Sequence, residues 1–293
     1  MKSFSDIKTI AVAGAGAMGS GIARQCALAG YPTLLYDISE EALSRAWIQI
    51  NHILDQAVEK QKITAEQKEK ALQKLAITQD IHALTTDVVI EAVAEKLEVK
   101  QELFRQLASQ NDPACIFATN TSSIPITRIA SAVPHPERVV GLHFFNPVHI
   151  MKLVEIVSGA FTHPVVTEAI RQLALELGKT PVLAKDSPGF IVNRVARPYY
   201  VEALRTLEEN CAPHDTIDVL MEATGFKLGP FRLMDLVGND INYAVTASLY
   251  ASFHYEPRFR PSRIQQQKVE SGHLGQKTGK GFYDYTAVHK PNT

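Results

Sequence analysis

The sequence lacks the features that define several classes of protein. It contains only three cysteines, Cys26, Cys115 and Cys211, and they lie far apart in the chain. Their spacing matches no metal or redox motif, so we expect reduced thiols, no disulfide framework and no metal site. No apolar run approaches the roughly 20 residues of a membrane span. The first residues lead directly into a strand-like apolar run, so no signal peptide is predicted.

Excess charge is also missing. The formal net charge is −1 over 293 residues, which argues against a nucleic-acid partner held by bulk electrostatics. The sequence has no internal repeats, low-complexity segments or blocks of like charge. A hydrophobic content of 45% is sufficient for the cores of one large or two moderate domains. These absences predict a cytoplasmic protein that binds neither nucleic acid nor membrane.

A glycine-rich turn follows the first apolar run. Residues 8–13 are typical of a strand, Gly14, Gly16 and Gly19 form a G-x-G-x-x-G motif, and an Ala-rich helix extends to residue 29. Gly14 permits a tight turn, Gly16 lets a pyrophosphate approach the backbone, and Gly19 lets the helix pack closely on the strand. The N-terminus of that helix favours phosphate charge. Other strand-to-helix turns share such spacing, but the complete strand, helix and later acid favour a dinucleotide site.

The later acid is Asp37, which follows the apolar residues 32–36. A carboxylate at this place accepts hydrogen bonds from the ribose 2′-hydroxyl and repels a 2′-phosphate. Residues 38–41 contain no arginine that would receive such a phosphate. The alternative role, capping of the helix that begins near Glu40, suits Ser39 better. The sequence therefore predicts NAD as the cofactor.

Strand and helix patterns alternate through the first 186 residues. This pattern predicts an α/β fold with a Rossmann-type doubly wound sheet, from which a helical hairpin after Asp37 is an excursion. Ser187 is predicted to cap a helix that begins at Pro188. We therefore expect an NAD-binding domain over residues 1–186 and an all-α substrate and dimerisation domain over residues 187–293. The predicted strands cover residues 75–78, 87–93, 115–120, 139–145, 153–157 and 180–184; the predicted helices cover 40–60, 64–75, 97–109 and 164–177.

Two ionisable residues, His143 and Glu155, lie inside apolar strands, where a charge is costly without a partner. Residues 146–152 are too few for a parallel crossover. Antiparallel pairing symmetric about His149 would place His143 opposite Glu155. The carboxylate would then fix the ring tautomer and raise its basicity, as a general base requires. A purely structural buried pair is the alternative.

Two polar residues follow at places where ligands bind. Ser122 follows a predicted strand, and ligands of open parallel sheets bind at the carboxyl ends of the strands. It is a candidate hydroxyl beside the nicotinamide, or else a turn or cap serine. Asn193 lies in the first turns of the interdomain helix, where it either faces the cleft or is an exposed helix residue.

Several motifs together resemble the L-3-hydroxyacyl-CoA dehydrogenase family. The likeness covers essentially the whole chain in order and matches the short single-function members, including bacterial 3-hydroxybutyryl-CoA dehydrogenases. The motifs are Asn120-Thr121-Ser122-Ser123, His143-Phe144-Phe145-Asn146-Pro147 with Met151 and Leu153-Val154-Glu155, the segment from Asp186 to Arg194, and the terminal Gly275, Lys277, Thr278, Gly279 and Gly281-Phe282-Tyr283.

The resemblance implies a reversible hydride transfer between C3 of an L-3-hydroxyacyl-CoA and NAD in fatty-acid or related acyl-CoA metabolism. It implies that His143 is the general base and Glu155 its electrostatic partner, that Ser122 bonds near the substrate oxygen and nicotinamide, and that Asn193 holds the reacting group. The resemblance also implies that the cofactor site contains further residues besides those of the glycine turn. The resulting set is Gly14, Gly16, Ala17, Met18, Gly19, Asp37, Glu95, Lys100, Ser122, Asn146 and Lys277.

The helical hairpin after Asp37 offers a site for the phosphates of CoA. Lys60 and Lys62 are the tentative contacts, together with Ser122 nearer the reacting end of the substrate, although any single lysine also suits a solvated helical face. Two other functions stay open: dehydrogenation of a free hydroxy acid such as gulonate or carnitine, and a non-catalytic NAD-binding structural role. The C-terminal helical domain is small for an independent core, and its apolar residues 231–237 and 243–245 predict an isologous homodimer.

Overall fold

The first unit of the chain is built on one eight-stranded sheet. The structure is a computed structural model that describes residues 1–286. The strand order is β3-β2-β1-β4-β5-β6-β7-β8. The strands from β3 to β6 are parallel, whereas β7 runs antiparallel to β6 and parallel to β8. The strands are β1 (Ile10–Ala13), β2 (Thr33–Tyr36), β3 (Leu75–Thr78), β4 (Val88–Glu91), β5 (Ile116–Thr119), β6 (Val139–Phe144), β7 (Leu153–Ser158) and β8 (Thr180–Lys185).

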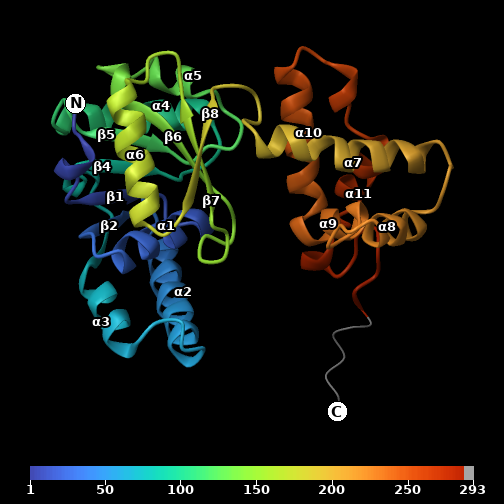
Figure 1. Cartoon of the computed structure of the whole chain (residues 1–293), viewed down its shortest axis with the longest axis horizontal. Helices are drawn as coiled ribbons and strands as arrows, with labels where there is room; N and C mark the ends of the chain where they lie inside the picture. Colours follow the sequence, from blue (N-terminus) through green and yellow to red (C-terminus); the bar gives the residue numbers. More distant parts are fainter. Residues whose placement is uncertain (287–293) are drawn as a thin grey trace. The chain divides into compact units, whose positions relative to one another are not determined.

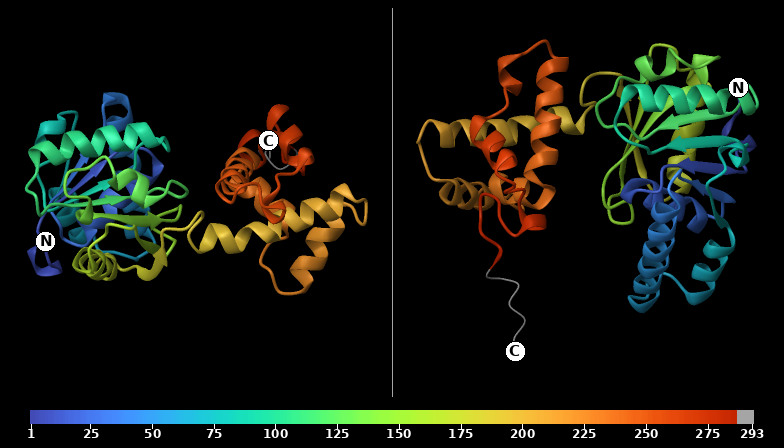
Figure 2. Two further views of the ribbon diagram at one scale, coloured as in Figure 1. Left: turned by 90° about the horizontal axis from the view of Figure 1, so that it is seen from above. Right: turned by 180° about the vertical axis from the view of Figure 1, so that it is seen from behind.

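Helices cover both faces of this sheet, which explains why its central strands are buried along their whole length and mostly apolar. Alternate residues of β1 enter different cores: Ile10 and Val12 pack with α1, α2 and α6, whereas Ala11 and Ala13 pack with α4 and α5. Figure 2 shows α4 and α6 on opposite sides of the strands. The helices are α1 (Ala17–Leu28), α2 (Glu40–Glu59), α3 (Ala65–Gln73), α4 (Leu97–Gln110), α5 (Ile126–Ala130) and α6 (Pro164–Glu176). The predicted doubly wound fold is confirmed.

The hairpin of α2 and α3 extends from the edge of the sheet, as Figure 1 shows. Ser39 caps α2, because its side chain accepts a hydrogen bond from the Ala42 amide. Thr64 caps α3 in a reciprocal capping box with Gln67. The cap at Ser39 was predicted from the sequence and is confirmed. The capped ends fix where the two helices begin and hence where the basic residues between them lie.

A second compact unit begins at Ile191. Its core is formed by apolar side chains from several helices, including Leu204, Phe231 and Met234, together with Phe282 from the last turn. Asp235 orders that turn by accepting hydrogen bonds from the amides of Phe282 and Tyr283. Among the described residues, no helix is both long and apolar enough to cross a membrane. The helices are α7 (Val192–Glu208), α8 (His214–Ala223), α9 (Pro230–Val237), α10 (Asn239–Ser252) and α11 (Arg263–Glu270).

The predicted start of the interdomain helix is wrong. The helix α7 begins at Val192 with Ile191 at its N-cap position, so Ser187 does not cap it and Pro188 is not its first residue. The reason is a tight turn in which Gly189 has φ 73° and Phe190 has φ 48°. Both are left-handed values that no right-handed helix contains. The Phe190 amide instead donates to the Ser187 carbonyl at 2.8 Å.

Candidate active site

The glycine turn after β1 leaves open space in front of a helix. Gly14 has φ 106°, and a Cβ on it would overlap the Ala92 carbonyl; a Cβ on Gly19 would overlap the carbonyl of Gly14. Gly16 is the N-cap residue of α1, and a Cβ on it would meet nothing within 4 Å. Two glycines are thus required by packing, while the third leaves room beside the helix N-terminus. This arrangement suits a pyrophosphate.

Asp37 lies at the end of β2 and is held by the backbone. Its Oδ2 accepts a hydrogen bond from the Ala15 amide at 2.7 Å, and its Oδ1 accepts one from the Ser39 amide at 3.0 Å. Each carboxylate oxygen has a further lone pair that can accept from a ribose hydroxyl. The glycine turn and the acid are therefore linked by a direct hydrogen bond, and together they would hold a nucleotide.

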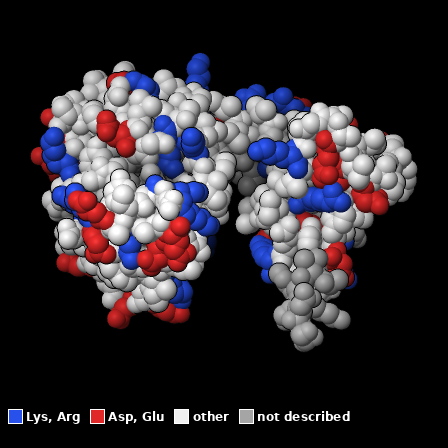
Figure 3. Space-filling view, turned by 60° about the horizontal axis from the view of Figure 1, so that its bottom comes forward, with Lys and Arg blue, Asp and Glu red and all other residues white. Residues whose placement is uncertain are grey.

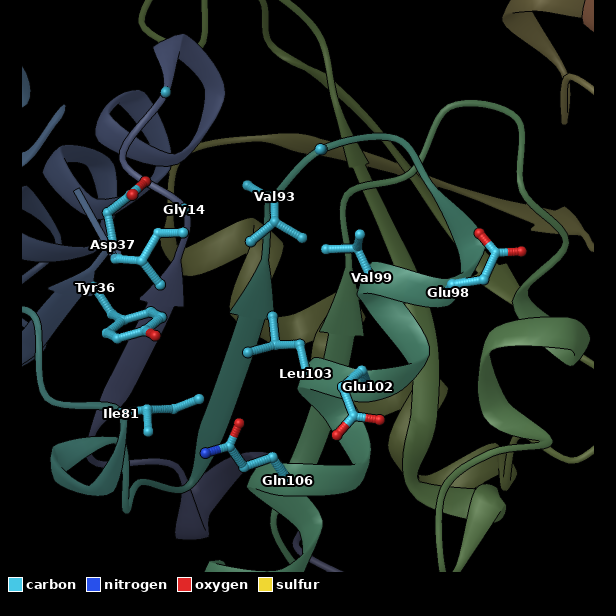
Figure 4. A pocket seen from close by; sticks show the side chains of 14 residues that line it. Gly14, Tyr36, Asp37, Ile81, Val93, Glu98, Val99, Glu102, Leu103 and Gln106 are labelled. Atoms are coloured by element: carbon cyan, nitrogen blue, oxygen red, sulfur yellow. The ribbon is translucent and has the colours of Figure 1, made fainter.

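A pocket of about 730 Å³ adjoins Asp37. Figure 4 shows Ile81, Val93 and Leu103 around its interior, with Asp37 at one end. Its ionisable lining residues are acidic or phenolic, and it has no lysine or arginine that would neutralise a 2′-phosphate. Apolar walls with a carboxylate at one end suit an adenosine with a free 2′-hydroxyl. The lining residues are Gly14, Gly16, Tyr36, Asp37, Ile38, Ile81, Ala92, Val93, Ala94, Glu98, Val99, Glu102, Leu103 and Gln106.

Most of the residues in this pocket wall were not predicted from the sequence. Val99, Leu103 and Gln106 lie on α4 at spacings of four and three residues, so they share one side of the helix. The neighbouring core-facing residues Phe104 and Leu107 form a different stripe. The sequence signal for the pocket is this second, partly apolar stripe of Val99, Leu103 and Gln106 on α4.

A buried charge network supports the same edge of the sheet. Lys100 is 1% exposed, and its Nζ lies 2.7 Å from Oε1 of Glu91 and 3.1 Å from Oε2 of Glu95. Burial raises the pKa of the Glu91 carboxyl, although Lys100 opposes the shift. Burial also acts to raise the pKa of Glu95. Lys100 and the hydrogen bonds from Thr121 and Ser122 outweigh this effect, so the pKa of Glu95 is lowered. Lys100 therefore stabilises the charged carboxylate of Glu95 from the buried side, and it does not line the pocket beside Asp37.

Glu95 in turn fixes the loop that carries Ser122. Its Oε1 accepts hydrogen bonds from the Thr121 hydroxyl at 2.6 Å and from the Ser122 amide at 2.9 Å. The Ser123 amide lies 3.3 Å from the same oxygen. This loop follows β5, so Ser122 lies at the carboxyl end of the parallel strands.

His143 and Glu155 form a buried pair. The register of β6 and β7 places the two residues opposite each other, as predicted, because the connecting loop is short. His143 Nδ1 lies 2.7 Å from Glu155 Oε2, and the side chains are 7% and 1% exposed. With Nδ1–H donated to the carboxylate, the lone pair of the neutral ring is on Nε2. That nitrogen is the atom suited to accept a proton.

Aromatic side chains surround this imidazole. The ring of Phe145 lies 4.5 Å from that of His143 between centroids, and the ring of Phe190 lies at 5.8 Å. These contacts restrict the orientation of the imidazole and exclude water from its sides, which strengthens its interaction with Glu155.

The remaining predicted residues lie on different elements. Asn146 is exposed and is the second residue after the end of β6. Asn193 lies in the first turn of α7, and Lys277 donates to Asp240 Oδ2 at 2.7 Å; both belong to the second unit. Lys60 and Lys62 line a pocket of about 230 Å³. In the described part of the chain, no group of three or more His, Cys, Asp or Glu side chains is arranged to hold a metal ion.

Comparison with known proteins identifies the family. The model of the 3-hydroxyacyl-CoA dehydrogenase NAD binding domain matches residues 9–187, and that of the 3-hydroxyacyl-CoA dehydrogenase C-terminal domain matches residues 189–285. The chain belongs to the 3-hydroxyacyl-CoA dehydrogenase family. The resemblance drawn from the sequence motifs is therefore confirmed, and the cofactor of this family's N-terminal domain is NAD.

Relatives within the family differ in length. The chain is 52% identical over 284 residues to a 3-hydroxyadipyl-CoA dehydrogenase from Escherichia coli, covering 96% of the chain but 60% of that protein. It is 40% identical to a 3-hydroxybutyryl-CoA dehydrogenase from Bradyrhizobium diazoefficiens, covering 95% of the chain and 96% of the relative. The crystal structure of an (S)-3-hydroxybutyryl-CoA dehydrogenase from Ralstonia eutropha superposes with a TM-score of 0.92 at 37% identity, covering 96% and 100% of the two chains.

Proposed function

We propose that this member of the 3-hydroxyacyl-CoA dehydrogenase family oxidises the 3-hydroxyl of an L-3-hydroxyacyl-CoA to a ketone, reversibly and with NAD. The observation that carries the proposal is the buried His143–Glu155 pair on the sheet that also carries the glycine turn. The parallel strands β1, β4, β5 and β6 end at one edge of the sheet. His143 is the next-to-last residue of β6, so a base and a dinucleotide site share that edge.

His143 acts as the general base. Nε2 accepts the proton of the 3-hydroxyl while a hydride leaves C3. NAD, which the glycine turn and Asp37 would hold, would supply the acceptor for that hydride. Glu155 stabilises the imidazolium that forms, because its carboxylate already accepts from Nδ1 at 2.7 Å. General-base assistance of this kind contributes about 10²- to 10⁴-fold in rate.

Ser122 orients the reacting oxygen. Glu95 holds the Ser122 backbone and leaves its hydroxyl only a long contact of 3.4 Å to the same carboxylate. A hydroxyl with so weak an internal partner is suited to bond the substrate oxygen or the nicotinamide. By the family resemblance we assign Asn193 to holding the reacting group, and Asn146 and Lys277 to the cofactor.

The thioester substrate is supported by the basic helical hairpin. Lys60 and Lys62 line a common pocket and suit the phosphates of CoA. The relatives' names include both a four-carbon and a six-carbon dicarboxylic acyl group, so both belong in a substrate panel.

We further propose a cytoplasmic homodimer formed through the helical unit. Apolar side chains are exposed on this unit, among them Leu220, Phe226, Leu236 and Ile241 at 50 to 58%. Burying such side chains against a second copy would stabilise the small unit. The free cysteines Cys26 and Cys115 are buried, as suits a reducing compartment.

NADH oxidation with a panel of 3-ketoacyl substrates tests the function. We expect turnover of acetoacetyl-CoA, of longer 3-ketoacyl-CoA esters or of 3-ketoadipyl-CoA, with little turnover of free acetoacetate. Faster reduction of a free keto acid would favour a hydroxy-acid dehydrogenase. Absence of turnover on the whole panel, with NADH still bound, would favour a non-catalytic NAD-binding protein.

A further inference from the structure

Arg24 is a buried cation that the reaction does not use. It lies on α1, is 2% exposed, and its Nη2 has no hydrogen-bond partner. Burial lowers its pKa to about 10, with no contribution from a nearby carboxylate. A guanidinium removed from water in this way is costly unless another group compensates its charge.

Other buried cations of this unit have partners. Lys100 is paired with Glu91 and Glu95. Lys179 donates to the carbonyl oxygens of Val148 and Met151. Arg24 differs from both lysines, because its buried Nη2 has no partner. Arg138 of the same unit also has an unpartnered Nε, but its Nη1 donates to the Asp112 carbonyl at 2.8 Å.

Two pockets meet at Arg24. One, of about 230 Å³, is lined by Lys60 and Lys62 at the end of α2. The other, of about 50 Å³, is lined by Ala17 of α1 and by Asn146. Arg24, Ile53 and His149 line both. No aspartate or glutamate lines either pocket.

Several cations lie close enough in this region to lower one another's pKa values. Burial lowers the pKa of His149, and Arg24, Lys62, Lys179 and Lys60 lower it further. Burial and Arg24 likewise lower the pKa of Lys179. Cations that destabilise one another's charged forms gain from a bound anion, which would stabilise them all.

We propose that Arg24 is the centre of a phosphate-binding site between α1, α2 and the loop of residues 146–150. The guanidinium presents a planar set of donors that matches phosphate oxygens, and Lys60 and Lys62 add point charges at the outer pocket. Three cations, with no aspartate or glutamate among the residues that line the two pockets, suit a diphosphate or phosphate monoester better than a single carboxylate. The phosphate belongs either to CoA, in which case the inference rests on the proposed function, or to a free phosphate compound.

Direct titration tests the site without any turnover. Pyrophosphate and adenosine 3′,5′-bisphosphate are titrated by calorimetry into wild type, Arg24→Met and Arg45→Met. Arg45 is the matched control, because it lies on α2 but is exposed and paired with Glu41. We expect Arg24→Met to bind at least about tenfold more weakly and the control to bind as wild type. Undetectable binding to wild type, or equal binding to Arg24→Met, would overturn the proposal.

The methionine keeps much of the volume of the side chain and removes an uncompensated charge, so we expect Arg24→Met to unfold at a temperature no lower than wild type. If it does not fold, Arg24→Lys replaces it, since lysine keeps the charge but loses the planar fork. Weaker binding to Arg24→Lys then supports the site, and unchanged binding refutes it.

Kinetics identifies the source of the phosphate. Acetoacetyl-CoA is compared with acetoacetyl-N-acetylcysteamine, a thioester without phosphates. If the phosphate is that of CoA, Arg24→Met raises the KM for acetoacetyl-CoA about tenfold and leaves kcat, the KM of the short thioester and NADH binding unchanged. Weakened pyrophosphate binding with an unchanged KM supports a site for free phosphate, whereas weakened NADH binding overturns the proposal. Absence of turnover with both thioesters would refute the proposed function but leave the calorimetric test valid.

Discussion

Replacing Lys100 by methionine is expected to destabilise the first unit in a pH-dependent way. Lys100 and Glu91 are 1% and 0% exposed, and their charged atoms lie 2.7 Å apart. Removing one partner of such a pair leaves the other charge buried and costs about 3–5 kcal/mol. Because Glu95 is also a partner of Lys100, we expect the loss for Lys100→Met to fall within this range at neutral pH.

The pH dependence follows from Glu91. Burial already raises its pKa in the folded protein, and Lys100 is the main opposing influence, so the variant should raise that pKa further. When the pKa of a carboxyl is higher in the folded than in the unfolded protein, the group stabilises the fold at pH values below its unfolded-state pKa, about 4.3. That stabilisation is lost as the pH rises through the folded-state pKa. The deficit of Lys100→Met relative to wild type should therefore be smaller at about pH 5 than at about pH 7.5.

Urea unfolding measures both effects. Trp47 is the single tryptophan of the chain and packs against the core of the first unit, so its fluorescence reports on this unit. Lys96→Met, an exposed neighbour on the same segment, is the control for the change of charge. Adding Glu91→Gln to Lys100→Met should recover part of the loss. A deficit below about 1 kcal/mol, the usual value for exposed pairs, or one that does not change with pH, would refute the reasoning.

Three further predictions concern cofactor, backbone and assembly. Asp37→Ala should weaken NAD and improve NADP in steady-state kinetics, because it removes both the 2′-hydroxyl acceptor and the repulsion of a 2′-phosphate; a wild-type enzyme that uses both cofactors equally would contradict this role. Gly19→Ala should abolish tight NAD binding in calorimetry, because its Cβ would overlap the Gly14 carbonyl; unchanged affinity would show that the turn relaxes freely. Light scattering at micromolar concentration should give the mass of a dimer, and the mass of a monomer would refute the proposed interface.

Local patterns predicted most of the first unit. The strands were predictable because each is a short apolar run bounded by turn residues, and the pairing of His143 with Glu155 was predictable because the loop between them is short. The start of α7 was not predictable in this way. Ser187-Pro188 is a common helix start, but the left-handed Phe190 delays the helix by a turn.

Roles that depend on side-chain direction were harder to predict. The place of Lys100 in the cofactor site stays a prediction, and its burial between Glu91 and Glu95 was not foreseen from the sequence. The apolar residues of α4 that line the pocket beside Asp37 were not distinguished from those that face the core. Arg24 lies in an otherwise Ala-rich helix that was interpreted only for its glycine contacts, so a buried guanidinium there was not foreseen.

The central claim is that His143 and Glu155 act as one base, and a double-mutant cycle on turnover tests it most directly. His143→Gln should lower kcat with acetoacetyl-CoA by at least about 10²-fold while NADH binding stays nearly unchanged. Glu155→Gln should also lower kcat, because it removes the charge that stabilises the imidazolium. The double variant should be little worse than His143→Gln alone. Folded His143→Gln enzyme with wild-type turnover would contradict the account.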